Sequence, residues 1–138
     1  MIIKYPKIIK PKTVNENALI STIDIMPSLL DLAGLSIPVD LDGRSFKNEI
    51  LYPNNKESKF NVVYSQNQFG RMVRFDKFKY VRSIVYGKRY EILFDIKNDP
   101  LESKNLINKF EFKEVAEKGR NLLDKWLKDE NTFLINQR

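Results

Sequence analysis

Alternating apolar and polar residues in the second half of the chain predict an antiparallel sheet. The alternation is clearest in residues 91–97, where Ile92, Phe94 and Ile96 occupy every second position. The same criterion predicts four strands, at residues 61–64, 71–75, 78–86 and 89–96. Two-residue loops, 76–77 and 87–88, join the last three, so these strands are antiparallel neighbours in a meander. Gly87 at the first loop position predicts a type II′ turn.

A long helix is predicted after the sheet, over residues 111–129. Apolar residues recur there at intervals of three and four, which is the pattern of a helix with one buried face. Gly119 falls within this apolar stripe and predicts close packing of the helix against the sheet. Asn98-Asp99-Pro100 ends the last strand, because Asn and Asp favour turns and the residue before a proline avoids the α region.

The first half of the chain predicts one short strand and two helices. Residues 2–5 are β-prone, and residues 19–34 contain a helix with Asp24 as its N-cap and Gly34 as its stop. The helix is apolar on nearly every side and is therefore expected to be buried. Residues 46–52 predict a short helix. The predicted strand starts at residue 2, and the apolar helix has more surface to bury than 138 residues can cover. Both features predict that the chain is a piece of a longer protein.

Composition restricts the possible chemistry. The 138 residues include no cysteine and no histidine, which excludes disulfides, thiolate or imidazole metal ligands and histidine-dependent triads within this chain. No apolar run approaches the roughly 18 residues of a membrane span. The net charge is +6, and seven basic residues but only one acid lie between Arg71 and Arg89. A basic face of this kind attracts anions, although a solvated sheet face explains it equally well.

Acidic residues supply only weak candidates for a metal or acid–base site. Asp40 and Asp42 are two residues apart in a loop but lack a third ligand. Asp95, Asp99 and Glu102 are denser, and turn formation with pairing to lysine or arginine is the favoured interpretation. Aromatic residues in the strands suit core packing better than stacking on nucleic-acid bases.

Three blocks of residues, in order, resemble the C-terminal part of a sulfatase of the arylsulfatase type, in the alkaline-phosphatase-like superfamily. Residues 2–6 and 9–11 resemble the family's strand and "P-G-x-I-x-x-G" turn, with Lys7 and Lys12 where the family has glycines. Residues 21–34, continued by Pro38 and residues 42–45, are similar to "D-x-x-P-T-L-L-x-x-A-G … P … D-G-x-S", with Ser28 where threonine is usual. Residues 71–74 and 79–80 lead to residues 91–106, which fit "E-L-Y-D-L-x-x-D-P-x-E-x-x-N-L", with Phe94 where tyrosine is usual. The resemblance covers nearly the whole chain.

The resemblance implies a catalytic apparatus that this chain lacks. Sulfatases use a formylglycine made from cysteine or serine in "C/S-x-P-x-R", together with a metal, usually calcium, and these lie upstream of the region matched here. Residues 36–40 imitate the motif, but Asp40 stands where arginine belongs and the position in the chain is wrong. We therefore expect no catalytic residue, metal or cofactor in this chain, and no activity from the chain alone.

The implied fold is an α/β, alkaline-phosphatase-like fragment in two parts. Residues 1–54 would supply a strand and packing helix from the end of the large α/β domain. Residues 55–138 would form an α+β subdomain with a four-stranded antiparallel sheet and a long C-terminal helix. In sulfatases this subdomain adjoins the active-site cleft, which makes four residues the substrate-binding candidates: Gln66, Asn67, Arg71 and Arg74.

The expected partners follow from the same resemblance. They are the upstream catalytic region and a sulfated small molecule or glycan, with no nucleic acid or membrane, and family habit suggests a periplasmic or exported protein. Two alternatives remain open from the residues. One is a noncatalytic anion-binding module for sulfated glycan or nucleic acid. The other is a fragment of a phosphodiester or phosphonate hydrolase of the same superfamily.

Overall fold

The computed structural model describes residues 1–53 and 58–136, with side chains described up to residue 129. It divides into two compact units, Met1–Asn61 and Val62–Arg138, which are described separately here. The predicted boundary between residues 54 and 55 lies outside the described residues. No helix among the described residues combines the length and apolar character required to span a membrane.

The first unit contains a 3₁₀ turn, η1 (Thr22–Asp24), and two helices, α1 (Ile25–Leu32) and α2 (Lys47–Leu51). Gly34 ends α1 in the left-handed conformation, with φ of 74°. The N–H of Leu35 donates to the carbonyl of Leu30, and that of Gly34 to the carbonyl of Asp31, which is the Schellman arrangement. The predicted glycine stop and the short second helix are both confirmed.

Two predictions for this unit are wrong. Residues 2–5 form no strand, because no described segment pairs with them and the only described sheet lies in the other unit. Helix α1 is not buried on most sides: Met26 and Leu29 are 55% and 59% exposed. Among the described residues of the first unit, only α2 and loops are available to cover it, which is too little for a helix with so much apolar surface.

Side-chain hydrogen bonds among residues 21–46 hold α1 to the loops on either side of it. The carboxylate of Asp24 accepts from the backbone N–H groups of Ser21 at 2.8 Å and Arg44 at 2.9 Å. The buried hydroxyl of Ser28 donates to the Asp24 carbonyl and accepts from the Phe46 N–H. A Cβ on Gly43 would lie 2.0 Å from the carbonyl oxygen of Ile23, so only glycine fits. Asp24 is thus an N-cap by position, but its carboxylate bonds to the preceding and distant backbone instead of the first turn of α1.

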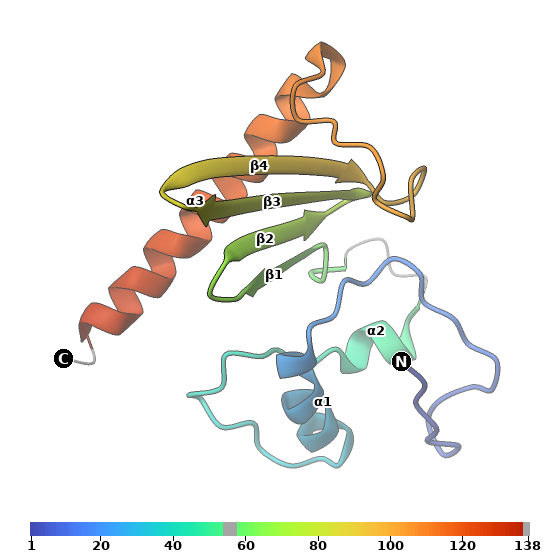
Figure 1. Ribbon diagram of the computed structural model, residues 1–138. Helices are drawn as coiled ribbons and strands as arrows, with labels where there is room; N and C mark the ends of the chain where they lie inside the picture. The colour runs from blue at the N-terminus through green and yellow to red at the C-terminus, as the bar shows by residue number, and fades with distance from the viewer. Residues whose placement is uncertain (54–57, 137–138) are drawn as a thin grey trace. The chain divides into compact units, whose positions relative to one another are not determined.

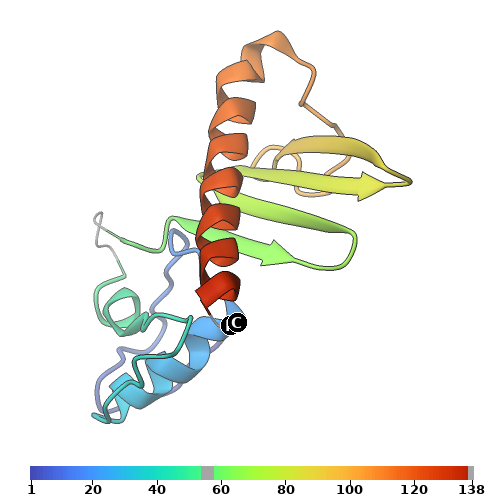
Figure 2. The same cartoon turned by 90° about the vertical axis from the view of Figure 1, so that its left-hand side faces the viewer.

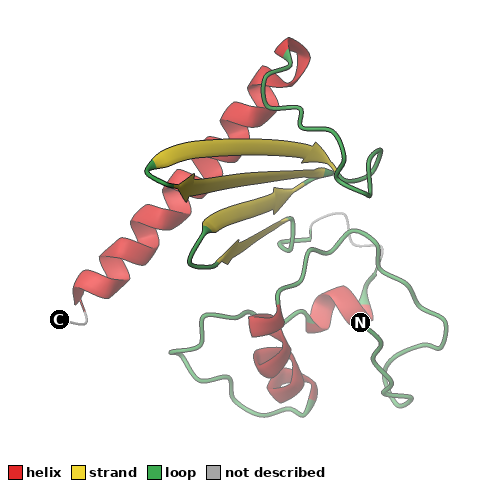
Figure 3. Ribbon diagram, in the orientation of Figure 1, coloured by secondary structure: helices red, strands yellow, loops and turns green. Residues whose placement is uncertain are grey.

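The second unit is a meander with a helix across one face (Figure 1). Its strands are β1 (Val62–Gln66), β2 (Gly70–Phe75), β3 (Phe78–Val85) and β4 (Lys88–Asp95), all antiparallel in the order β1-β2-β3-β4. A short η2 (Phe110–Phe112) precedes α3 (Lys113–Asn136). Figure 2 shows α3 crossing the strands, and Figure 3 distinguishes the strands from the helices by colour. The predicted four-stranded sheet and long C-terminal helix are confirmed.

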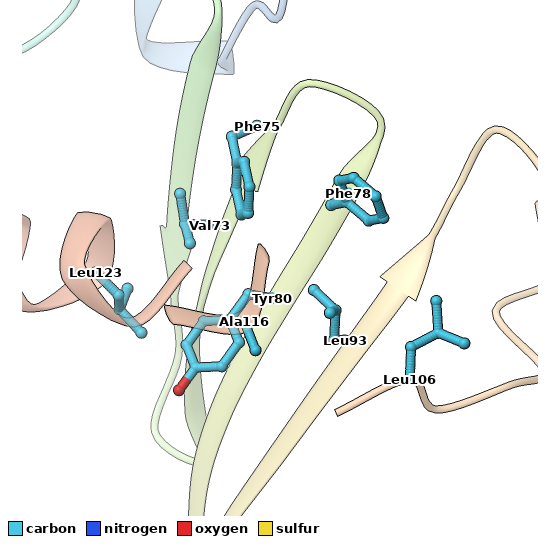
Figure 4. Packing of buried hydrophobic residues seen from close by; sticks show 8 residues of the cluster. All are labelled: Val73, Phe75, Phe78, Tyr80, Leu93, Leu106, Ala116 and Leu123. Carbon is cyan, nitrogen blue, oxygen red and sulfur yellow. The ribbon is translucent and has the colours of Figure 1, made fainter. Parts of the chain in front are cut away.

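The core lies between α3 and one sheet face (Figure 4). Its fully buried members include Val73 on β2, Tyr80 on β3 and Leu123 on α3. Gly119 allows the helix to approach closely, since a Cβ there would lie 2.8 Å from the Tyr80 Cβ and 3.3 Å from the Phe75 Cε1. The close packing predicted from the position of Gly119 is therefore confirmed.

The loop between β3 and β4 differs from its prediction. Val85 pairs with Lys88, so Tyr86 and Gly87 form the turn, not Gly87 and Lys88. Both turn residues have positive φ, 49° and 73°, which is a type I′ turn instead of type II′. A type I′ turn matches the right-handed twist of a two-stranded ribbon, and the register follows from it.

Candidate functional site

Two of the four predicted substrate-binding residues lie directly opposite each other. Gln66 ends β1 and pairs in register with Arg71 near the start of β2. Both side chains are exposed and belong to the sheet face that carries α3. The structure therefore brings an amide and a guanidinium together at one end of the β1–β2 hairpin.

Asn67 holds the turn of this hairpin. Its side-chain oxygen accepts hydrogen bonds from the N–H groups of Phe69 and Gly70, both at 2.9 Å. Its own N–H donates to the Gly70 carbonyl at 2.9 Å. These bonds set the position of the neighbouring Gln66 and Arg71.

Arg74 lies on the opposite sheet face from Arg71, because residues three apart on a strand point to opposite sides. It pairs in register with Lys79, whose ammonium lies 2.6 Å from the Glu102 carboxylate. The Nε of Arg74 is buried and has no hydrogen-bond partner among the described residues. Arg71 and Arg74 consequently cannot contact the same small anion, although the sequence places them three residues apart.

A second arginine stands beside Arg71. Arg82 pairs with it in register across β2 and β3, so two positive charges face each other directly. Like charges in this arrangement repel unless an acid or a bound anion compensates them. Asp124 of α3 compensates Arg82, at 2.6 Å from its Nη1, and the carboxyl pKa of Asp124 is lowered chiefly by that bond.

Glu91 on β4 is the centre of a network that joins the sheet to α3. Its carboxylate accepts from the Tyr80 hydroxyl at 2.6 Å, from Arg89 at 2.7 Å and from Arg120 of α3 at 2.8 Å. The bonds from Arg120 contribute most to lowering the pKa of Glu91 from 4.5 to about 2. Glu91 is therefore ionised at all ordinary pH values, which makes it a structural anchor and unsuitable as a general acid.

Sequence reasoning missed this network. In the sequence Glu91 stands out only as part of the family pattern, because its partners Tyr80 and Arg120 lie 11 and 29 residues away. Arg120 falls at the edge of the predicted apolar stripe of the helix, which is the only sequence signal that it faces the sheet.

The denser acidic group, residues 95–102, serves the turn as expected. Burial acts to raise the pKa of Asp95, but hydrogen bonds from Lys77 and Asn98 outweigh it and leave this pKa below its usual value. Asp99 accepts bonds from the Ser103 hydroxyl and the Lys104 N–H. Glu102 pairs with Lys79. Turn formation and pairing with lysine are confirmed for this group.

The described residues offer no place for the family's metal. They contain no group of three or more His, Cys, Asp or Glu side chains placed to hold an ion. Asp40 and Asp42 are both exposed in a loop, as are residues 36–40, which imitate the formylglycine motif. The available donors therefore do not fit calcium.

The chain matches a family of known proteins over nearly its whole length. Residues 1–129 match the family model described as N-sulphoglucosamine sulphohydrolase, C-terminal. The Delta 4,5-hexuronate-2-O-sulfatase of Bacteroides thetaiotaomicron is 33% identical over 113 residues, which are 77% of this chain and 23% of that protein. An arylsulfatase of Clostridium perfringens is 34% identical over 75% of this chain and 22% of its own length. An ulvan-active sulfatase of Formosa agariphila is 27% identical over 96% of this chain and 33% of its own length.

Solved structures agree. The structure of BT4656 in complex with its substrate D-glucosamine-2-N,6-O-disulfate matches 92% of this chain and 27% of its own, with a TM-score of 0.79 at 25% identity. A phosphonate monoester hydrolase of Agrobacterium radiobacter matches with a TM-score of 0.55 at 20% identity, a likeness of fold alone. These neighbours have the alkaline-phosphatase-like fold that was expected. The chain spans between 19% and 33% of the length of the curated relatives.

Proposed function

Because this chain belongs to the sulfatase family, whose C-terminal domain it matches, we propose that the full-length protein hydrolyses sulfate esters of a carbohydrate. The observation that carries the proposal is the match of residues 1–129 to the C-terminal sulfatase domain. The carbohydrate class is supported by the names of the relatives, which specify ulvan, a hexuronate and a glucosamine disulfate.

The reacting groups of this proposal lie outside the chain. A formylglycine requires a cysteine or serine in the proper motif, but the chain has no cysteine and its one similar segment has Asp40 in place of the arginine. The described residues do not fit a calcium ion either. We propose that an upstream catalytic region supplies both, and that the chain described here has no turnover alone.

We propose that Arg71 and Gln66 are the contribution of this domain to substrate binding. Arg71 is exposed, and Arg82 lies opposite it but is already paired with Asp124, so Arg71 is the charge available to an anion. A guanidinium can bind a sulfate or carboxylate through two parallel hydrogen bonds, and the amide of Gln66 adds a further donor. Asn67 would maintain their spacing through the turn. Arg74, on the other face, would contact a different group.

A direct assay tests the location of the active site. The full-length protein is incubated with a generic aryl sulfate and calcium, in parallel with the 138-residue chain. We expect turnover by the full-length protein and none above background by the 138-residue chain. Turnover by the short chain would overturn the assignment of the catalytic groups to the upstream region.

The same assay separates the related chemistries. A phosphonate ester and a phosphodiester are offered beside the aryl sulfate, since the phosphonate hydrolase neighbour shares the fold. Preference for either one would replace the sulfatase proposal.

Arg71→Ala in the full-length protein tests the binding role of this residue. It should raise KM for a sulfated saccharide with little change in kcat, because the lost contact stabilises the bound substrate and the transition state equally. Lys97→Ala, which removes an exposed cation in the β4 turn, is the control and should change neither.

A further inference from the structure

The β3–β4 hairpin extends beyond the rest of its sheet. β2 pairs with β3 only as far as Gly70 opposite Ser83, whereas β3 and β4 continue to the pair Val85 and Lys88. In Figure 2 this end of the hairpin reaches further from α3 than the β1–β2 turn does. We call residues 84–90 the hairpin tip. None of its residues belongs to the buried core cluster formed by the described residues, so its composition is not dictated by the core.

The hairpin tip is apolar, aromatic and basic. Its exposed hydrophobic residues, with their exposed fractions, are Ile84 (63%), Val85 (40%), Tyr86 (98%) and Tyr90 (48%). Residues 84–90 include two basic side chains, Lys88 and Arg89, and no acid. Val85 and Tyr90 lie on the sheet face opposite α3, Tyr86 is at the turn, and Ile84 lies on the face that carries α3. Large apolar side chains that gather on an exposed face mark a surface that binds something, and a cation beside them favours an anionic partner.

Tyr86 occupies a backbone position that does not suit it. Its φ of 49° lies in the left-handed region, where the first central residue of a type I′ turn is usually Asn, Asp or Gly. A bulky aromatic residue is disfavoured there. Because 98% of the side chain is exposed, packing within the fold does not compensate for this cost. A strained, unpacked aromatic residue at an exposed turn indicates a role outside folding.

Lys88 and Tyr90 lie on the same side of the ribbon, since they are two residues apart on β4. Arg89 points to the other side, where its guanidinium lies 2.7 Å from Glu91. Lys88, by contrast, forms no ion pair within the part of the chain that the structure describes. One face of the hairpin tip therefore offers an aromatic ring beside an uncompensated cation, with Tyr86 at its end.

We propose that the hairpin tip binds a sulfated polysaccharide. The rings of Tyr86 and Tyr90 would pack on the apolar faces of sugar units, and Lys88 would pair with a sulfate group. The inference rests on the proposed function, because it assumes that the substrate is a sulfated polysaccharide. It adds a contact with sugar units that are distant from the sugar whose sulfate ester is hydrolysed. Other occupants, a second copy of the chain or the upstream region, are outcomes of the test below.

Binding of heparin to the 138-residue chain, measured by titration calorimetry, tests the proposal. Tyr86→Asn should weaken binding about tenfold, equivalent to about 1.4 kcal/mol, while raising the urea midpoint because Asn-Gly suits the turn. Lys88→Ala should weaken binding several-fold and reduce its salt dependence. The matched controls are Phe110→Ala, an aromatic residue that is 88% exposed elsewhere, and Lys97→Ala. Neither control should change the affinity.

Several results would overturn the proposal. They are no binding by the wild-type chain, equal binding of chemically desulfated heparin, and unchanged affinity in Tyr86→Asn. Sedimentation that shows a dimer abolished by Tyr86→Asn would assign the hairpin tip to a second copy. Hydrogen exchange without polymer would be compared between the 138-residue chain and the full-length protein. If the hairpin tip is protected only in the full-length protein, it contacts the upstream region.

Failure of this inference is distinguishable from failure of the proposed function. If the full-length protein hydrolyses an aryl sulfate but its Tyr86→Asn variant has an unchanged KM for a sulfated polymer, only the inference fails. If the full-length protein hydrolyses no sulfate ester, the proposed function fails, whatever the chain binds. The expected result is an unchanged rate on the aryl sulfate and a raised KM on the polymer.

Discussion

Replacing Glu91 by glutamine should show how strongly the sheet and α3 depend on one charge. Glutamine keeps the size of the side chain and one acceptor oxygen, but it cannot accept charge-assisted bonds from both Arg89 and Arg120. Arg120 would retain only Glu117, at 3.2 Å, which is 60% exposed. Tyr80, fully buried in the core, would lose its anionic acceptor at 2.6 Å.

The magnitude follows from the pKa of Glu91. A carboxyl pKa of about 2 in the folded protein, against 4.5 for the ordinary group, corresponds to roughly 3 kcal/mol of stabilisation at neutral pH. Arg89 is 54% exposed, so solvent screens part of this. We expect Glu91→Gln to lower the free energy of unfolding by about 2 kcal/mol at pH 7.

The pH dependence has a definite sign. A depressed folded-state pKa gives stability that is present above the unfolded-state value and is lost as the pH falls through the folded-state value. The difference between wild type and Glu91→Gln should therefore be full above about pH 5 and shrink between 4.5 and about 2. Other carboxylates titrate in both proteins and largely cancel in the difference.

Urea unfolding followed by tryptophan fluorescence measures this effect. Trp126 is the single tryptophan, and it stacks on Tyr64 with ring centroids 5.1 Å apart, so it reports on the second unit. Glu117→Gln is the matched control, because it removes a bond to the same Arg120 from an exposed site and should cost less than about 0.5 kcal/mol. Equal losses in the two variants at pH 7, or a difference that persists at pH 2, would refute the reasoning.

Two further predictions concern stability. Gly119→Ala should lower the free energy of unfolding by about 1–2 kcal/mol in the same urea assay, because crowding of Tyr80 at 2.8 Å outweighs the gain of about 1 kcal/mol in helix propensity. The control is Asn121→Ala, at an exposed position of the same helix, which should stabilise the protein slightly, whereas a stabilised Gly119→Ala variant would contradict the close packing. Asp99→Ala should lower the urea midpoint by removing the acceptor of the Ser103 and Lys104 bonds, and in the full-length protein it should leave turnover per folded molecule unchanged. A fall in that turnover would show that the acidic turn takes part in catalysis.

Local pattern predicted the second unit well and the first unit poorly. The strands of the meander pair with their sequence neighbours, so alternation and loop length suffice to identify them. Residues 2–5 have the composition of a strand but no partner among the described residues, and α1 has an apolar surface that the first unit cannot cover. Both failures arise where the stabilising contacts would come from segments outside the local sequence.

The candidate site was predicted only in part, for a geometric reason. Gln66 and Arg71 were chosen from the sequence and lie opposite each other. Arg74 was chosen with them, although the two-residue period of a strand places it on the other face. The type of turn at Tyr86 also depends on the register between β3 and β4. A shift of that register by one residue changes which residues form the turn and which face each side chain occupies.

The sequence by itself determined the family, the meander, the closing helix and the absence of cysteine and histidine chemistry from this chain. These follow from residue identity and short-range periodicity. Only the tertiary structure decided that Glu91 is anchored by Tyr80 and Arg120, that Arg71 and Arg74 are separated, and that the β3–β4 hairpin extends past its sheet. Those features depend on contacts between distant residues and on strand register, which the order of residues along the chain does not reveal.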